Sequence, residues 1–338
     1  MSTAPKPWLS ILLPVYGVEA YVAACAESIL SQAGAGVELV FVDDASPDGS
    51  AALLAALQAT HPQRVRVLRH AVNSGISAAR NTLLDAARGD YLWFIDPDDL
   101  MEAGALAALK AIVNAHHPDW ISCDFRTFDD DTGQPRRARH AHQSSFSGPA
   151  NARSEDTDLL IRGLLQAGQL HPWSKIIRRA IWPAELRFPA ARVFEDLAVF
   201  PRLAPHARSF FYAPQVWVAY RQRAGSTLAN LTGAKLDDWT HALVGYGDLL
   251  RGSSAETRFV AAHFSARTFL RAAKRLTRLA PPDLPTTLTH FAQRWQASSP
   301  LSAAELLRGY LRRGWWWRAA QLAFWLRRAR YTPISSIS

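Results

Sequence analysis

Short apolar runs alternate with helix-forming segments over the first hundred residues. Continuous apolar runs predict strands buried on both faces at residues 8–16, 37–43 and 91–95, and a shorter alternating run predicts another at 64–69. Apolar spacing or an alanine- and leucine-rich composition predicts helices at 18–29, 50–61, 76–88 and 101–115, and Gly89 stands where a helix-ending glycine belongs. Strands that alternate with helices imply parallel crossovers, so we expect an α/β fold with a doubly wound sheet.

The pattern is mixed after residue 118. Residues 124–149 are polar and charged, which predicts a surface loop or hairpin. We expect helices at 157–166 and 195–203 and, from an aromatic and β-branched run, a strand or hairpin at 210–220. Beyond about residue 230 the chain is predicted to be mainly helical, with a proline break near residue 281.

Composition narrows the class of protein. The chain has 338 residues, of which 49% are hydrophobic, and this length fits one large or two medium domains. Its net charge of +9 suits an anionic partner. We expect no secretory signal and no spanning helix, because no stretch reaches ~18 uninterrupted apolar residues. Cys25 and Cys123 lie in apolar stretches and predict buried thiols in a reducing compartment.

Carboxylates cluster after two of the predicted strands. Asp96, Asp98 and Asp99 directly follow the strand at 91–95, where such a cluster is costly unless a cation neutralises it. Oxygen ligands without a neighbouring Cys or His favour Mg²⁺ or Mn²⁺, which usually share phosphate oxygens. The alternative is a turn in which Asp98 or Asp99 caps the next helix. Asp43 and Asp44 leave a similar choice, between a turn and a nucleoside contact.

Four successive motifs carry a resemblance to a known family. They are SILLPVY at 10–16, VDDASPDG at 42–49, NSGISAARN at 73–81 and DPDD at 96–99. Over about residues 8–225 the chain resembles inverting family 2 glycosyltransferases of the capsule, lipopolysaccharide and exopolysaccharide type. It departs from their pattern at Gly17, where asparagine is usual. The resemblance implies a GT-A fold, which is a Rossmann-like, mostly parallel sheet between helices.

The same resemblance implies a division of the chain. The catalytic domain would be residues 1–228, with a nucleotide-sugar half at about 8–118 and an acceptor half at about 119–228, followed by a helical region at 229–338.

A nucleotide-diphosphate sugar, in the first place a UDP-sugar, is the implied donor, together with Mn²⁺ or Mg²⁺. The implied donor-binding residues are Pro14, Tyr16, Glu19, Asp43, Asp44, Asn73, Gly75, Arg80, Asp96, Asp98, Asp99, Trp173, Lys175, Arg221 and Arg223. Asp96 and Asp98 form the Asp-x-Asp motif for ribose and metal. Without the resemblance, Trp173 would be a core residue and Lys175 and the arginines would be surface charges.

Glu195 and Asp196 resemble the Glu-Asp pair of this family. The resemblance implies that Asp196 is the general base that deprotonates the acceptor hydroxyl, with Glu195 orienting it, in one inverting displacement. The metal would offset the charge that grows on the leaving diphosphate. The alternative is an acidic first helical turn that complements the helix dipole.

Arginine and tryptophan are interleaved in residues 305–330. Seven arginines accompany a single acid, Glu305, and the segment includes Trp315, Trp316, Trp317 and Trp325. This composition suits the headgroup layer of an anionic membrane, so we expect peripheral binding to the cytoplasmic face of the cell membrane and a lipid-linked or polysaccharide acceptor. The alternative is packing of the tryptophans on the catalytic domain. No nucleic-acid-binding motif accompanies the charge, so we expect no nucleic acid partner.

Two other functions make different predictions. A catalytically silent nucleotide-binding subunit of a membrane glycan-assembly complex would bind nucleotide without turnover, but it has no need of the intact acidic motifs. A hydrolase with paired carboxylates would cleave a glycoside with no nucleotide present.

Overall fold

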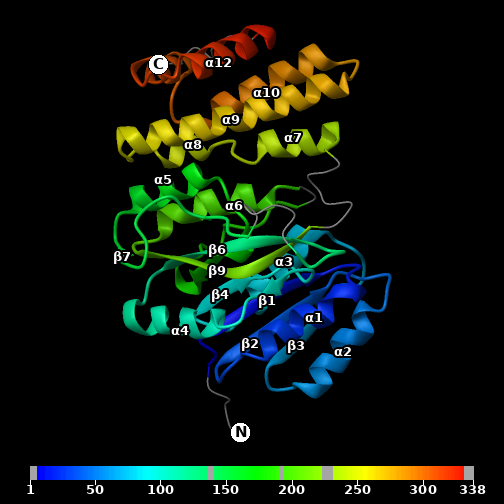
Figure 1. The fold of residues 1–338 in the computed structure, drawn as a ribbon. Helices are drawn as coiled ribbons and strands as arrows, with labels where there is room; N and C mark the ends of the chain where they lie inside the picture. The colour runs from blue at the N-terminus through cyan, green and yellow to red at the C-terminus, as the bar shows by residue number, and fades with distance from the viewer. Residues whose placement is uncertain (1–5, 135–140, 191–192, 223–230, 331–338) are drawn as a thin grey trace.

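The computed structural model describes residues 6–134, 141–190, 193–222 and 231–330 (Figure 1). In these ranges the strands form one nine-stranded sheet. They are β1 (Leu9–Val15), β2 (Val37–Asp43), β3 (Val65–Arg69), β4 (Tyr91–Phe94), β5 (Leu100–Met101), β6 (Trp120–Asp129), β7 (Arg153–Ser154), β8 (Lys175–Arg178) and β9 (Phe210–Gln222). Their order is β3–β2–β1–β4–β8–β6–β9–β5, with β7 paired to β9.

Helices cover both faces of this sheet and then continue as a helical layer (Figure 1). In chain order they are α1 (Glu19–Leu30), α2 (Ser50–Thr60), α3 (Ile76–Ala86), α4 (Ala105–His116), α5 (Thr157–Ala167), α6 (Glu195–Leu203), α7 (Gly233–His241), α8 (Tyr246–Leu249), α9 (Ala255–Leu279), α10 (Leu284–Ser298), α11 (Ala303–Arg312) and α12 (Trp316–Arg328).

The predicted parallel crossovers account for half of the sheet. Strands β3, β2, β1 and β4 are parallel, as the alternation of strands and helices predicts. The second half is mixed, because β8 is antiparallel to both β4 and β6, whereas β6 and β9 are parallel. The sheet is therefore an α/β sheet whose doubly wound part ends at β4.

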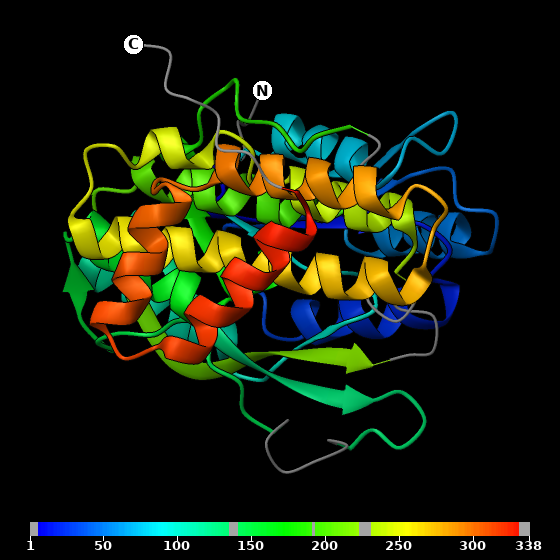
Figure 2. The same cartoon turned by 90° about the horizontal axis from the view of Figure 1, so that it is seen from above.

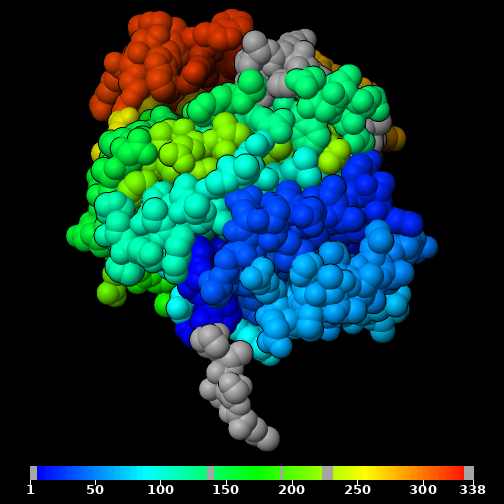
Figure 3. Space-filling view, turned by 60° about the horizontal axis from the view of Figure 1, so that its bottom comes forward, coloured from blue at the N-terminus to red at the C-terminus, as the bar shows by residue number. Residues whose placement is uncertain are grey.

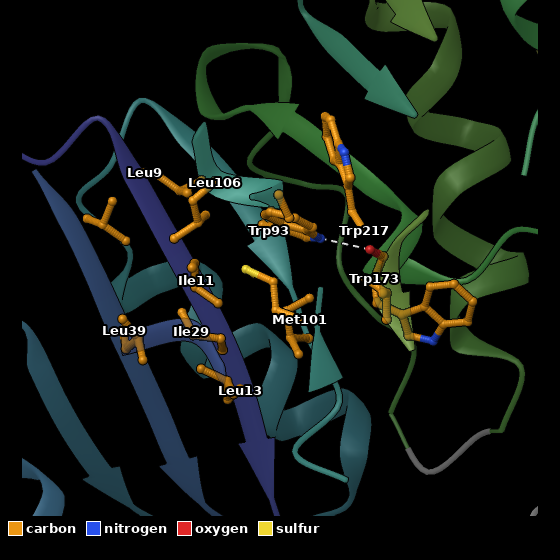
Figure 4. Close-up of a cluster of buried hydrophobic side chains, with 14 of the residues drawn as sticks. Leu9, Ile11, Leu13, Ile29, Leu39, Trp93, Met101, Leu106, Trp173 and Trp217 are labelled. Atoms are coloured by element: carbon orange, nitrogen blue, oxygen red, sulfur yellow. Dashed lines mark hydrogen bonds between the residues drawn. The ribbon is translucent and has the colours of Figure 1, made fainter. Parts of the chain in front are cut away.

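Strand β1 is buried on both faces, which explains its continuous apolar sequence. Leu9, Ile11 and Leu13 pack into one core, whereas Leu12 faces the other core. In the first core, shown in Figure 4, the indole nitrogen of Trp93 donates a hydrogen bond of 2.7 Å to the backbone oxygen of Trp173. This bond ties the end of β4 to the segment that follows α5.

Two local predictions are wrong, and a third holds only in part. The helix expected at 101–115 begins only at Ala105, because Leu100 and Met101 pair with β9 as β5. Of the surface loop or hairpin expected at 124–149, residues 124–129 complete β6 and are mostly buried, and Phe125 forms an antiparallel bridge with Gln143, as a hairpin would. Gly89 does not end α3, which stops at Ala86; an added Cβ at Gly89 would lie 2.5 Å from the backbone nitrogen of Ser10, so this glycine allows close packing against β1.

The described helices from α7 onward lie at the end of the molecule opposite the N-terminal strands (Figures 1 and 3). They build a third core around α9, α10, α11 and α12, and α12 crosses over α9 and α10 in Figure 2. Residues of α8 and α9 also enter the second core beneath the sheet. The predicted boundary at 228 and 229 falls in residues 223–230, outside the described residues, so the division stays a prediction.

The length and composition of the helices bear on whether the chain could cross a membrane. Among the described residues, no helix combines the length and the apolar character that crossing a bilayer requires.

Candidate active site

Asp44 organises the loop that follows β3. Its carboxylate accepts hydrogen bonds from the backbone nitrogens of Ser74 (2.9 Å) and Gly75 (2.7 Å), and His70 Nδ1 lies 2.6 Å away. Gly75 has φ +87, a conformation that favours glycine, and precedes α3. The predicted residues Asp44 and Gly75 are therefore joined directly, while Asn73 beside them is exposed.

The loops after β1 and β2 hold each other. Glu19 accepts a hydrogen bond of 2.8 Å from the backbone nitrogen of Gly49, and the backbone nitrogen of Glu19 donates to Asp48. Buried Asp43 accepts a bond from the backbone nitrogen of Ser46. Pro14 lies within buried β1, and Tyr16, just beyond it, is half exposed. Tyr16 is thus a predicted donor contact that this edge leaves open to solvent.

An acidic turn follows β4. Asp99 is fully buried, and its pKa is raised well above the usual range by burial and then by the charges of Asp98 and Asp96. One Asp99 oxygen accepts a bond of 2.8 Å from the backbone nitrogen of Arg221, and the other has no hydrogen-bond partner among the described residues. Burial and the neighbouring carboxylates therefore both act against ionisation of Asp99.

Arg221 braces this turn from β9. Its guanidinium donates to the backbone oxygen of Asp98 (2.7 Å) and to Asp130 (2.8 Å), and it lies over the rings of Tyr21 and Phe128. Arg221 was predicted to contact the donor, whereas its contacts here hold the acidic turn in place. Arg223, predicted alongside it, lies outside the described residues.

The acidic turn fits a divalent ion that shares a diphosphate. In the ranges described, no three His, Cys, Asp or Glu side chains form a group that could hold a metal by themselves. Mg²⁺ and Mn²⁺ commonly take one or two protein carboxylates and complete their coordination with water and substrate phosphates. The unpartnered oxygen of buried Asp99 and its raised pKa indicate charge that such a cation would relieve.

Arg80 joins the acidic turn to the start of α6. Its side chain is 4% exposed, and it pairs with Asp96 (3.1 Å) and with Glu195. Burial raises the pKa of Glu195, and the charge of Arg80 opposes that shift. Two predicted groups far apart in sequence, Asp96 and Glu195, therefore share one guanidinium.

Asp196 begins α6 beside Glu195. Burial raises the pKa of its carboxyl, with Arg80 acting against the shift. Asp196 Oδ1 accepts a bond from the backbone nitrogen of Leu197, and Oδ2 lies 3.9 Å from His171 Nδ1. Burial and the charge of Lys175 lower the pKa of His171 to about 4, so this imidazole is neutral at pH 7 and its proton can face the carboxylate.

Trp173 and Lys175 lie in the core instead of at the surface. Lys175 is 1% exposed and donates to the backbone oxygen of Gln169 (2.7 Å) and to the hydroxyl of Ser174 (2.5 Å). The Trp173 ring stacks on His171, with ring centroids 4.7 Å apart and planes at 8°. Both residues thus position His171 opposite Asp196, and their predicted part in donor binding would be indirect.

Sequence reasoning missed three groups near the predicted residues. His70 and His171 each stand beside a predicted carboxylate, Asp44 and Asp196 respectively, and Asp130 pairs with Arg221. His171 precedes the Trp-x-Lys segment by two residues, so that segment could have drawn attention to it. His70 and Asp130 lie outside every motif, so only the packing of β3 and β6 reveals them.

Comparisons with known proteins find glycosyltransferases among the proteins similar to this chain. Residues 10–174 match the family model described as Glycosyl transferase family 2. The uncharacterized glycosyltransferase EpsJ of Bacillus subtilis is 36% identical over 119 residues, which are 35% of this chain and 34% of EpsJ. Glycosyltransferase GlyA of Streptococcus pneumoniae is 25% identical over 242 residues, 70% of this chain and 33% of GlyA. The chain thus matches about a third of the length of each of these two relatives.

Solved structures share the fold. S. aureus TarS 1–349 in complex with UDP-GlcNAc has a TM-score of 0.69 and 21% identity, covering 95% of this chain and 90% of that one. The mannosyltransferase PcManGT of Pyrobaculum calidifontis, in complex with GDP-Man and Mn²⁺, has a TM-score of 0.52 and 18% identity, covering 97% and 88%. At these identities the likeness shows the α/β fold alone.

Proposed function

Because residues 10–174 form a glycosyl transferase family 2 domain on a GT-A-like fold, we propose that this chain transfers a sugar from a nucleotide-diphosphate donor to a saccharide hydroxyl, with inversion, in cell-surface glycan synthesis. One observation carries the proposal: Arg80 holds Asp96 and Glu195 on a single buried guanidinium. Transfer needs a group that serves the leaving diphosphate and a base for the acceptor, and this contact joins Asp96 to Glu195, the residue directly before the proposed base Asp196.

The donor side takes a sugar nucleotide, with a UDP-sugar as the first choice. Support comes from TarS, which was solved with UDP-GlcNAc, and from PcManGT, which was solved with GDP-Man and Mn²⁺. Asp96 and Asp98 would hold Mn²⁺ or Mg²⁺. When bound, the ion neutralises charge that develops on the leaving diphosphate. Asp44 keeps the turn at Gly75 in place, and the exposed Tyr16 would meet the nucleoside.

On the acceptor side, Asp196 removes the proton of the attacking hydroxyl. Burial raises the pKa of Asp196, which makes its carboxylate a stronger base than that of an exposed aspartate. His171 lies 3.9 Å away and orients the carboxylate, and Glu195 anchors the first turn of α6 to Arg80. The hydroxyl oxygen then displaces the nucleoside diphosphate in one step.

The C-terminal helices keep the enzyme at an anionic membrane, where a lipid-linked or polysaccharide acceptor is found. Trp316, Trp317 and Phe324 of α12 are 67%, 74% and 56% exposed, and the arginines 318, 327 and 328 on the same helix are exposed as well. Trp315 and Trp325 instead pack into the third core. Half-exposed aromatics flanked by arginine suit the headgroup layer of the cytoplasmic face.

Release of nucleoside diphosphate tests the proposal. The purified chain is incubated with a panel of UDP- and GDP-sugars and Mn²⁺, and released diphosphate is measured with and without saccharide acceptors. We expect release that depends on the metal and on one donor. A silent nucleotide-binding subunit would instead be stabilised against heat by a nucleotide and would release no nucleoside diphosphate from any donor. Cleavage of a simple glycoside in nucleotide-free buffer would indicate a hydrolase.

A further inference from the structure

A small polar pocket lies beside Asp196, at the junction of the sheet-bearing part with the C-terminal helices. Its volume is about 200 Å³. Its walls come from the segment after α5, the start of α6, and helices α7 and α9. The titratable groups in these walls are His171, Asp196, Arg267 and Arg271. Nothing in the proposed mechanism so far uses the two arginines.

Arg267 and Arg271 stand one turn apart on α9, and both line the pocket. Within the described part of the chain, no ion pair involves either side chain, although Arg294 and Arg313 in neighbouring helices pair with Asp237 and Glu256. Burial and the charges of Arg271 and Arg318 lower the pKa of Arg267. Like charges at this spacing repel each other and destabilise the helix, so an anion bound in the pocket would offset the repulsion between the two arginines.

Positive charge continues from this pocket to the outer helix. Arg318 of α12 lies 2.7 Å from His263 of α9 and over the ring of Trp315, 4.3 Å from its centroid. The exposed Trp316 and Trp317 stand directly before Arg318. In Figures 1 and 2, α12 covers the side of α9 that points away from the sheet. A path of arginines therefore links the pocket to the aromatic surface.

We propose that this pocket binds a phosphate group of the acceptor, carried on a lipid, with Arg267 and Arg271 on the phosphate and the acceptor sugar towards Asp196. The inference rests on the proposed function and names its acceptor class. Guanidinium groups pair with phosphate through two parallel hydrogen bonds, which suits this ligand better than a neutral glycan. A lipid-borne phosphate also matches the aromatic surface of α12, which would meet the bilayer while the headgroup reaches the pocket.

Binding of a short, soluble prenyl diphosphate tests the pocket directly. Citronellyl diphosphate, inorganic pyrophosphate and uncharged citronellol are titrated calorimetrically into the full chain, with EDTA present so that no metal takes part. Wild type is compared with Arg267→Gln/Arg271→Gln and with Arg278→Gln, an exposed arginine of the same helix outside the pocket. Unfolding temperatures establish that each variant is folded.

We expect wild type and the Arg278 variant to bind citronellyl diphosphate alike, the double variant to bind it at least about tenfold more weakly, and citronellol not to bind. Pyrophosphate is expected to bind more weakly than the prenyl ester. Equal affinity of wild type and the double variant for citronellyl diphosphate overturns the pocket assignment. Equal affinity of wild type for the two anions overturns the lipid-borne source.

Failure of the proposed function gives a different result. Donor hydrolysis with Mn²⁺ and no acceptor tests the proposed function separately, and we expect it in wild type and in the Arg278 variant, whose substitution lies outside the pocket. If no form releases nucleoside diphosphate but arginine-dependent binding is present, the proposed function is wrong and the anion pocket stands.

Discussion

Trp239 of α7 stacks on Phe194, the residue that directly precedes Glu195, with ring centroids 5.2 Å apart and planes at 12°. Phe194 has φ +63, a left-handed conformation that is unfavourable for a bulky residue and persists only where its surroundings hold it. Asp238 adds a second restraint by accepting a hydrogen bond of 3.2 Å from the backbone nitrogen of Val193. The C-terminal helices therefore help to hold the turn that presents Asp196.

Loss of the Trp239 ring should reduce turnover without touching the donor site. In Trp239→Ala we expect kcat to fall about tenfold, since a small displacement of a catalytic group is costly, while KM for the donor stays within about twofold. Steady-state kinetics in detergent solution measure both constants. Trp317→Ala, which removes an exposed indole, is the matched control and should keep wild-type kinetics. Unchanged kcat in Trp239→Ala would contradict the bracing role.

Replacement of Asp98 should remove the metal response. In Asp98→Asn the acidic turn loses one of its two proposed ligands, so we expect kcat to fall by about 100-fold or more, with the Mn²⁺ concentration for half-maximal activity shifted upward. Manganese titrations of initial rate provide the test. Glu27→Gln, an exposed carboxylate of α1, serves as the control for charge alone. A variant with normal rates at low Mn²⁺ would show that Asp98 is no ligand.

The ionisation of the candidate base, Asp196, should appear in the dependence of kcat on pH. Asp196 must be ionised to accept a proton, and its pKa is raised, so kcat should decline as pH falls through that raised value, above the usual carboxylate range. Asp196→Asn should lower kcat by roughly 10²- to 10⁴-fold and leave donor affinity intact, as measured by calorimetry with a sugar nucleotide. The assignment fails if this variant keeps both its rate and the acidic limb.

Breaking the Arg80 contact should cost stability. Arg80→Leu leaves Glu195 buried without its partner, and we expect the free energy of unfolding to drop by about 3–5 kcal/mol. Urea denaturation followed by circular dichroism gives this value. The exposed pair of Arg187 with Asp85, 2.8 Å apart, is the control, and Arg187→Leu should cost less than about 1 kcal/mol. An equal loss of unfolding free energy in the two variants would contradict a stabilising buried ion pair between Arg80 and Glu195.

Membrane binding should depend on the exposed aromatics of α12. The double variant Trp316→Ser/Trp317→Ser is expected to lose most of its sedimentation with vesicles rich in anionic lipid, and wild type should bind such vesicles better than neutral ones. Leu249→Ser, which replaces an exposed apolar side chain of α8, controls for the loss of exposed apolar surface elsewhere, and this variant should bind as wild type does. Binding that is unaffected by the tryptophans, or equal for neutral vesicles, would contradict the proposed contact.

The motifs and the parallel half of the fold followed from the chain alone. Burial on both faces makes β1 and β2 continuous apolar runs, and the four motifs lie within residues 10–174, which match the model of glycosyl transferase family 2. The hairpin alternative allowed a strand at residues 124–129, but the polar sequence predicted a surface position and not its burial. Asp124 there is fully buried, and hydrogen bonds from Tyr212 and from the backbone of Ser145 satisfy its charge.

By itself, the sequence determined which residues follow the strands and which family motifs they resemble, because turn and strand chemistry are encoded locally. Only the tertiary structure decided their partners. Asp96 meets Glu195 through Arg80, and Lys175 is a core residue, because packing brings together segments about a hundred residues apart. The structure also separates the tryptophans of the tail: Trp315 and Trp325 pack into a core of the C-terminal helices, whereas Trp316 and Trp317 lie at the surface, because a helix can bury only one of its faces. The membrane contact stays a prediction.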